Sequence, residues 1–382
     1  MHAAAQQPLQ PERPTASPLG SRRASRVGAR LSGALPARRQ MRLANAVARV
    51  LVVFAVVLAV IYWLVTQPFV VAQTSAPPTV DVTALEAHVR ALSERFYPRS
   101  FDQPEKLDAA AAYIKSEFLR AGARVEEQVF PVEEAQYRNI IARYGPELGA
   151  VLVIGAHYDS FADPLRGEDS RKGYGPESHT PGADDNASGV AALLELGRLL
   201  GRSRPSIGVE LVAYSVEEPP HFRTEAMGSS WHARQLRQSG RKLVLMISLE
   251  MVGYFNNAPA SQAYPLGLLG RIYPDRGDFI AVVGRVQDWA VTRGVKAAML
   301  GASDLPVESI NALPMLTGVD FSDHLSYWNE GFAALMITDT SFYRNPYYHS
   351  AGDTADRLDY GRLAKVVQGV YAVAQHYADI RE

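Results

Sequence analysis

The chain has 382 residues, of which 47% are hydrophobic, and a formal net charge of −1. This length allows one large domain or two ordinary ones, and the near-neutral charge gives no sign of a nucleic-acid partner. The chain has no cysteine. Disulfides and thiolate metal ligands are therefore excluded, and any metal must be held by His, Asp and Glu.

The first 49 residues form a basic segment that is poor in core-forming side chains. They contain nine arginines and a single acid, Glu12, with several Pro, Ser and Ala residues. A segment of this composition buries too little apolar surface to fold. We therefore predict a disordered basic arm over residues 1–45.

An uninterrupted apolar run, Val50–Val65, follows the basic segment. About 20 apolar residues span a bilayer as a helix, and Tyr62 and Trp63 lie near the far end, where an interfacial aromatic belt would be. A core helix is the alternative, but a helix that is apolar on every face is poorly explained in that way. We predict a transmembrane signal-anchor over residues 46–71.

The arginines also predict the orientation of this span. The positive-inside rule leaves the arginine-rich arm in the cytoplasm and places the rest of the chain outside, in the periplasm or the extracellular space. The chain would then be a single-pass membrane protein. A cleaved signal peptide is the competing interpretation, but the basic segment is long for one and no clean A-x-A cleavage site follows the apolar run.

After a predicted linker over 72–80, the sequence pattern favours one large α/β domain over 81–382. Strand-like runs alternate with helix patterns, which predicts a mixed, mostly parallel central sheet with helices on both faces. Helices are predicted over 81–96, 104–121, 187–200, 228–238, 285–293 and 359–378. Strands are predicted over 137–144, 151–156, 207–215, 243–249, 279–283 and 333–337, with the first two as neighbours.

Acidic residues and histidines stand at the ends of several of these elements. They are His157 and Asp159, Asp184 and Asp185, Glu217 and Glu218, Glu250, and His349. Taken alone, each has an ordinary structural explanation, such as a hydrogen-bonded histidine, a solvated glutamate pair or a helix cap. Their recurrence at successive ends of buried elements favours a metal site, because ionised carboxylates are costly there unless a cation compensates them.

The adjacent pair Glu217 and Glu218 needs a special backbone to serve one site. Side chains alternate between the two faces of a regular strand, so neighbouring glutamates normally point apart. Pro219 and Pro220 end the strand directly after the pair. A break in the pleat at this point would let both carboxylates face the same side.

In chain order, the motifs HYDS, PGADDNASG, EE, LEMVG, SDH and YHSAGDT follow one another between His157 and Thr354. This series resembles the two-zinc aminopeptidase family (peptidase family M28), which also contains glutaminyl cyclases and glutamate carboxypeptidases. The resemblance covers roughly residues 85–378. It implies a zinc-exopeptidase-like fold and a metallopeptidase catalytic domain over 81–382.

The resemblance implies two metal sites that share one ligand. His157 and Glu250 would hold one zinc ion, and Glu218 and His349 would hold the other. Asp185, the acid directly before the Asn of the motif, would bridge them. Two zinc ions are expected, with a single ion as the alternative. Glu250 departs from the pattern, because many members of the family have Asp there, and the extra methylene changes the reach of the carboxylate.

The remaining matches imply roles around these ligands. Glu217 would be the general base. Asp159 would orient His157, as carboxylates often do beside a metal-bound imidazole. Asp323 and His324 match a motif of the substrate-pocket wall, and a structural role is the open alternative for both. The polar loop 161–180 is either a substrate-binding rim or a solvated loop.

These matches imply a zinc aminopeptidase that removes N-terminal residues from peptides through a metal-activated water, and the predicted span would anchor it to a membrane. A glutaminyl cyclase-like aminoacyltransferase is the second hypothesis, and such relatives need one zinc. A non-catalytic pseudo-peptidase that binds peptides is the third, although all the ligand positions and the base are filled. A carboxypeptidase is disfavoured because the relatives with that activity carry additional domains.

Overall fold

The computed structural model describes residues 37–76, 78–165 and 174–378. The chain divides into two compact units, residues 1–56 and residues 57–382. The helix α1 (Ala37–Thr66) begins in the first unit and ends in the second. Among the described residues it is the one helix long and apolar enough to cross a membrane.

The start of α1 corrects one boundary predicted from the sequence. Residues 37–45 are helical and do not belong to a disordered arm, whereas residues 1–36 lie outside the described part of the chain. Ala, Arg, Gln, Leu and Met dominate residues 37–43. These residues have high helix propensity, so the helix extends beyond its apolar run.

The second unit is built on one eight-stranded sheet of order β1-β2-β4-β3-β5-β8-β6-β7. The strands are β1 (Arg124–Val132), β2 (Ala135–Tyr144), β3 (Val151–His157), β4 (Gly208–Tyr214), β5 (Leu243–Glu250), β6 (Ile280–Arg285), β7 (Val307–Ala312) and β8 (Ala334–Thr338). The four central strands β4, β3, β5 and β8 are mutually parallel. Their carboxyl ends therefore lie at one edge of the sheet.

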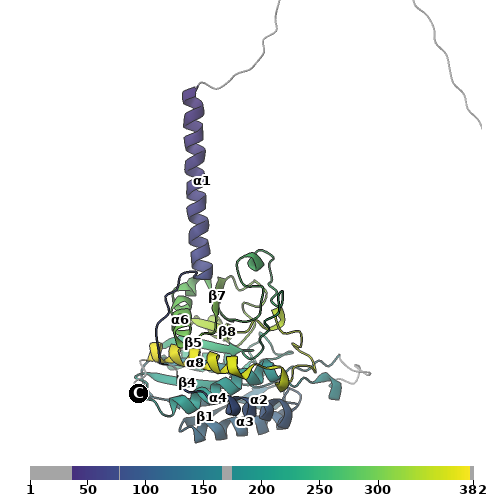
Figure 1. Cartoon of the computed structure of the whole chain (residues 1–382). Helices are drawn as coiled ribbons and strands as arrows, with labels where there is room; N and C mark the ends of the chain where they lie inside the picture. Colours follow the sequence, from purple (N-terminus) through teal and green to yellow (C-terminus); the bar gives the residue numbers. More distant parts are fainter. Residues whose placement is uncertain (1–36, 77, 166–173, 379–382) are drawn as a thin grey trace, which may run out of the picture. The chain divides into compact units, whose positions relative to one another are not determined.

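Helices cover both faces of the sheet, as the sequence predicts; apart from α1, the helices labelled in Figure 1 belong to one of these faces. One face carries α2 (Val82–Arg90), α3 (Pro104–Arg120), α4 (Gly189–Leu200), α6 (Trp289–Ala302) and α8 (Tyr360–Ala378). The other carries α5 (Gly228–Ser239) and α7 (His324–Asn329). The predicted mixed, mostly parallel α/β sheet is confirmed.

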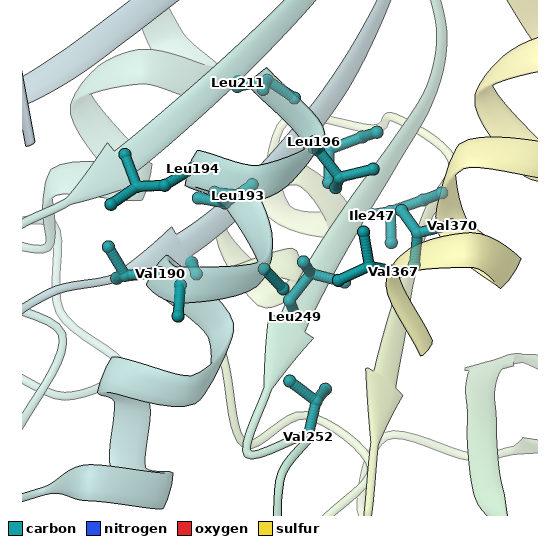
Figure 2. Packing of buried hydrophobic residues seen from close by; sticks show 14 of the residues in the cluster. Val190, Leu193, Leu194, Leu196, Leu211, Ile247, Leu249, Val252, Val367 and Val370 are labelled. Atoms are coloured by element: carbon teal, nitrogen blue, oxygen red, sulfur yellow. The ribbon is translucent and has the colours of Figure 1, made fainter. Parts of the chain in front are cut away.

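The larger hydrophobic core lies between the sheet and the helices α4 and α8. Figure 2 shows Val190 and Leu193 of α4, Ile247 and Leu249 of β5, and Val367 and Val370 of α8 gathered in one cluster. All of these side chains are fully buried. Burial of an aliphatic side chain stabilises a fold by about 1.5–3 kcal/mol, so this cluster holds the start of α4 firmly against β5.

Two strands and one pairing differ from the sequence prediction. β1 and β7 were not predicted, and β2 is not the neighbour of β3, because β4 lies between them. β1 and β7 are the two edge strands of the sheet. In β7 the buried positions include the polar residues Ser309 and Asn311, which hides the apolar alternation that identifies a strand.

Candidate metal centre

The predicted metal ligands converge at the carboxyl edge of the four parallel strands. The Nε2 atom of His157 lies 3.4 Å from an oxygen of Asp185 and 3.4 Å from an oxygen of Glu250. The Nε2 atom of His349 lies 3.3 Å from the other oxygen of Asp185 and 3.3 Å from Glu218. The two carboxylate oxygens of Asp185 therefore face two different histidines, which is the arrangement of a bridging ligand.

Glu217 and Glu218 reach the same site because the backbone turns sharply after β4. Val216 has a φ of 61°, in the left-handed region that a β-branched residue rarely adopts. The next two backbone N–H groups, of Glu217 and Glu218, both donate to one carboxylate oxygen of Asp159, at 2.9 and 3.0 Å. The predicted break in the pleat is present, and it begins before the glutamate pair.

Left-handed backbone recurs beside the other ligands. Met251, directly after Glu250, has a φ of 48°, and His349 itself has a φ of 51°. Such conformations cost of order 1–3 kcal/mol each and cluster at functional sites. The ring of His349 is also stacked between Phe161 and Tyr348, with centroids 3.8 and 3.7 Å away. Backbone and packing together fix the direction of this imidazole.

The loop that carries Asp185 is held by a second buried acid, Asp353. Its carboxylate accepts the backbone N–H groups of Asp184 and Asp185, both at 3.0 Å. Asp184 does not face the histidines, because its carboxylate accepts from the backbone of Gly253 and the side chain of Asn345, both at 2.9 Å. Of these two acids, Asp185 is the one that faces the histidines.

Arg99 is a buried cation beside the centre that the sequence did not single out. Its guanidinium donates to the backbone carbonyls of Leu92, Tyr158, Pro181 and Gly182, at 2.6–2.9 Å. It therefore ties the strand end that bears His157 to the loop that bears Asp185. A lone arginine in a loop carries no signal of this role in the sequence. The role depends on carbonyls from one nearby and two distant segments.

The centre concentrates negative charge away from water. Burial, together with the Asp185 carboxylate, raises the pKa of Glu218 to about 7, and burial raises the pKa of Glu217 well above its ordinary value. Burial alone would lower the pKa of His349, but Glu218 and Asp185 outweigh it and raise this pKa to about 10. Without a cation, Glu217 and Glu218 are thus driven towards protonation.

The residues present suit one or two metal ions. Three groups, His157–Asp185–Glu250, Asp185–Glu218–His349 and His157–Glu217–Glu218, each offer ligand atoms within 4.8 Å of one another. Within the described part of the chain, Nε2 of His157 and one oxygen of Glu218 are buried without a hydrogen-bond partner. Imidazole nitrogens and carboxylate oxygens are ligands that zinc accepts.

A cavity of about 300 Å³ extends from this centre along the face of β8, β6 and β7. Its walls are mainly apolar and include Phe222, Phe279, Leu316, Phe321 and Phe342. The described lining contains neither Asp323 nor His324, which were predicted as pocket residues. Both are buried, and His324 contacts the carbonyl of Val319 through Nε2 at 2.8 Å.

The loop 161–180 is described only in part. Arg166, Arg171 and Lys172 lie outside the described residues. His179 is buried, and its Nε2 atom lies 2.9 Å from a carboxylate oxygen of Asp102. This histidine therefore has a structural partner away from the metal ligands.

Comparisons with known proteins find that the chain is similar to peptidases. The family model "Peptidase family M28" matches residues 139–374. An Escherichia coli (strain K12) protein, the uncharacterized YfbL, is 50% identical over 321 residues, which cover 84% of this chain and 95% of that protein. A probable leucine aminopeptidase of Arthroderma otae is 28% identical, and the match covers 65% of this chain but only 59% of the fungal protein.

Solved structures share the fold at lower identity. A glutaminyl cyclase of Bacteroides thetaiotaomicron has a TM-score of 0.59 at 22% identity, covering 78% of this chain and 98% of that chain. A leucine aminopeptidase precursor of the same organism has a TM-score of 0.58 at 22% identity, covering 78% of this chain and 97% of that chain.

Proposed function

Because the chain belongs to peptidase family M28, we propose that it is a metal-dependent aminopeptidase anchored to a membrane by α1. The observation that carries this proposal is the position of Asp185, whose two oxygens face His157 and His349 separately. A shared carboxylate between two ligand pairs fits two zinc ions better than one. Bound metals would supply a water of lowered pKa and polarise the scissile carbonyl.

Glu217 is the proposed general base. Its carboxylate lies 3.8 Å from Nε2 of His157, beside both ligand pairs, and a raised pKa suits a group that accepts and returns a proton near neutral pH. It would take a proton from the attacking water as the water oxygen bonds to the carbonyl carbon. The same proton would pass to the departing amine as the C–N bond breaks.

The inner end of the cavity favours cleavage at the N-terminus. Asp185, Glu218 and Glu250 line it and would hold the metal ions, and a bound zinc ion would accept the nitrogen of a free α-amino group. The apolar walls beyond would accept a large apolar side chain of the first residue. We therefore expect leucyl and phenylalanyl substrates to be preferred over aspartyl and N-acetylated ones.

Glu217→Gln tests the assignment directly. The full chain in detergent, loaded with zinc, should hydrolyse leucyl-nitroanilide, and the variant should lose about 10²–10⁴-fold in kcat while metal content by mass spectrometry stays unchanged. Glu225→Gln is the matched control, because Glu225 follows in the same segment with a side chain 95% exposed. Full activity of Glu217→Gln would remove this residue from the chemistry.

The glutaminyl cyclase hypothesis is kept because a cyclase shares the fold. A peptide with N-terminal glutamine distinguishes the two activities. Cyclisation releases ammonia and keeps the peptide bond, whereas aminopeptidase action releases free glutamine. One bound zinc per chain together with ammonia release would replace the aminopeptidase assignment.

A further inference from the structure

Five large apolar side chains are exposed on two loops of the peptidase domain. Leu266, Leu268 and Ile272 belong to one loop, and Leu313 and Met315 to another; Met315 is 86% exposed and Leu268 64%. Isolated exposed apolar residues are normal on protein surfaces. These five, here called the apolar loop surface, are unusual because both loops attach to the same edge strand, β7.

The attachments to β7 are specific. The hydroxyl of Tyr273, next to Ile272, donates to the carbonyl of Ser309 at 2.7 Å. Leu313 directly follows Ala312, the last residue of β7. Because a strand advances about 3.3 Å per residue, Leu313 lies within about 7 Å along the chain of Asn311.

The end of α1 is bound to the same short stretch of β7. The hydroxyl of Ser309 donates to the carbonyl of Thr66 at 3.0 Å, and the side-chain amide of Gln67 donates to Asn311 at 2.7 Å. These contacts lie within residues 57–382, which form one compact unit. The helix end and both loops therefore meet at one strand.

One turn closer to the predicted bilayer, α1 still contacts the domain. The ring centroid of Trp63 lies 5.0 Å from that of Trp289, at the start of α6. The guanidinium of Arg293 lies over the ring of Trp63, 5.5 Å from its centroid. A helix rises 1.5 Å per residue, so Trp63 is about 4.5 Å beyond Thr66 along the axis, towards the membrane. Tryptophan at this level is typical of the membrane–water interface.

We propose that the apolar loop surface is seated in the interfacial layer of the membrane that α1 crosses. This inference rests on the proposed anchoring by α1. The partner is a lipid surface rather than a second copy of the chain, because the surface adjoins the point where the span leaves the bilayer. Interfacial segments bury apolar side chains about 5–10 Å into the headgroup boundary.

The same loops connect the membrane to the candidate active site. Leu269 and Tyr273 of the first and Leu316 of the second line the cavity that begins at the metal centre. The apolar cavity therefore runs between the metal ligands and the segments assigned to the lipid interface. The substrate class that follows is the apolar N-terminus of a polypeptide held at the membrane surface.

The absence of cysteine makes the placement directly measurable. Single variants Leu268→Cys and Met315→Cys of the full chain would carry a fluorescent label in nanodiscs of phosphatidylethanolamine and phosphatidylglycerol. Val129→Cys is the matched control, since Val129 is 54% exposed on β1, at the opposite edge of the sheet. Leu58→Cys, inside α1, reports whether the helix is inserted.

Lipids that carry a nitroxide on the acyl chain should quench the labels at 268 and 315 severalfold more than the label at 129. Equal quenching at all three positions, with position 58 strongly quenched, would overturn the proposal and leave the anchoring intact. Shielding of 268 and 315 from a water-soluble quencher without lipid quenching would also overturn it, in favour of a protein partner. No quenching at 58 would remove the anchoring and this inference together.

Hydrolysis of leucyl-nitroanilide in the same nanodiscs separates this proposal from the proposed activity. Lipid quenching without hydrolysis would support the surface and reject the aminopeptidase. Hydrolysis without lipid quenching would support the aminopeptidase and reject the contact of the apolar loop surface with lipid.

Discussion

At the scale of single residues, the centre depends on carboxylates with unequal tasks. Asp185 faces both histidines, whereas Asp159 and Asp353 hold backbone N–H groups and so set the direction of the ligands. Carboxylates that orient metal ligands typically contribute about 10–100-fold to metal affinity. Substitutions at these residues should therefore change metal affinity.

Asp159→Asn should lower zinc affinity by about 10–100-fold. The amide has one acceptor oxygen and no charge, so it supports the N–H groups of Glu217 and Glu218 and the ring of His157 less well. Competition with a fluorescent chelator measures the change. Asp163→Asn, in the loop that follows, is the control and should leave affinity unchanged; equal affinities for both variants would contradict the role of Asp159.

Glu250→Asp should weaken one of the two metal sites. The shorter side chain withdraws the carboxylate by about one C–C bond, roughly 1.5 Å, while the hydroxyl of Ser322 is placed 2.7 Å from the longer side chain. Zinc titration followed by calorimetry should show one affinity reduced and one retained. Two unchanged affinities would mean that the extra methylene of Glu250 has no function in binding.

Much of this residue-level picture can be predicted from the sequence, because each ligand sits in a short motif at the end of a strand or loop. Glu217 and Glu218 could be proposed for one site because two prolines follow them. Arg99 and Phe161 could not be found in this way. Their partners come from segments far away in the chain, and no local pattern marks a guanidinium that binds carbonyls or a ring that stacks on His349.

At the scale of elements, the contact between α4 and β5 leaves no space for an added atom. A Cβ at Gly189, the first residue of α4, would lie 2.4 Å from the side-chain oxygen of Asn186 and 2.7 Å from the carbonyl of Leu249. The loop bearing Asp185 leads directly into this contact. The position of that loop therefore depends on a residue without a side chain.

Gly189→Ala should destabilise the fold by about 1–3 kcal/mol, because the backbone of β5 cannot move away. Gly361→Ala is the matched control at the start of α8, where the nearest atom would be 3.4 Å away. There, loss of glycine flexibility should stabilise the helix by about 0.5 kcal/mol. Urea unfolding measures the free energy of unfolding of both variants. A change of the same sign in both would contradict the packing explanation.

The strands that were predicted are the buried central ones, whose apolar runs are easily recognised. The two that were missed, β1 and β7, are edge strands. The first five residues of β1 include four polar ones, and β7 buries Ser309 and Asn311 for contacts with the end of α1 and with Gln67. The order of the strands in the sheet could not be predicted from the sequence either. β2 and β3 are consecutive in the chain, but β4 lies between them in the sheet.

At the scale of the whole molecule, the metal-free protein should lose stability as the pH rises from about 5 to about 8. The pKa values of Glu218 and Asp323 are raised by burial, each to about 7. Groups with a raised folded pKa stabilise the protein at lower pH, and this contribution is lost as the pH passes the folded value. Carboxylates with lowered pKa values, such as Glu210, are already ionised throughout this range.

Zinc should cancel this loss. Metal ions compensate the carboxylates and compete with protons for the ligands, so binding is stronger at higher pH. The difference in Tm between the zinc-loaded and the metal-free protein should therefore grow from about pH 5 to about pH 8 in scanning calorimetry. A difference that shrinks over this range would contradict a cation site at these residues.

The connection between α1 and the domain has little free length. Gln67 is bonded to β7, the backbone N–H of Gln73 donates to the carbonyl of Ala297 in α6 at 2.9 Å, and Gly301 leaves room for the passing chain. If α1 crosses a membrane as proposed, this connection would hold the candidate active site at a nearly constant distance from the bilayer. Soluble peptides would reach the site freely. A polypeptide anchored in the same bilayer would be cleaved only if its N-terminus extends over this distance, so cleavage would depend on how far the polypeptide protrudes from the membrane.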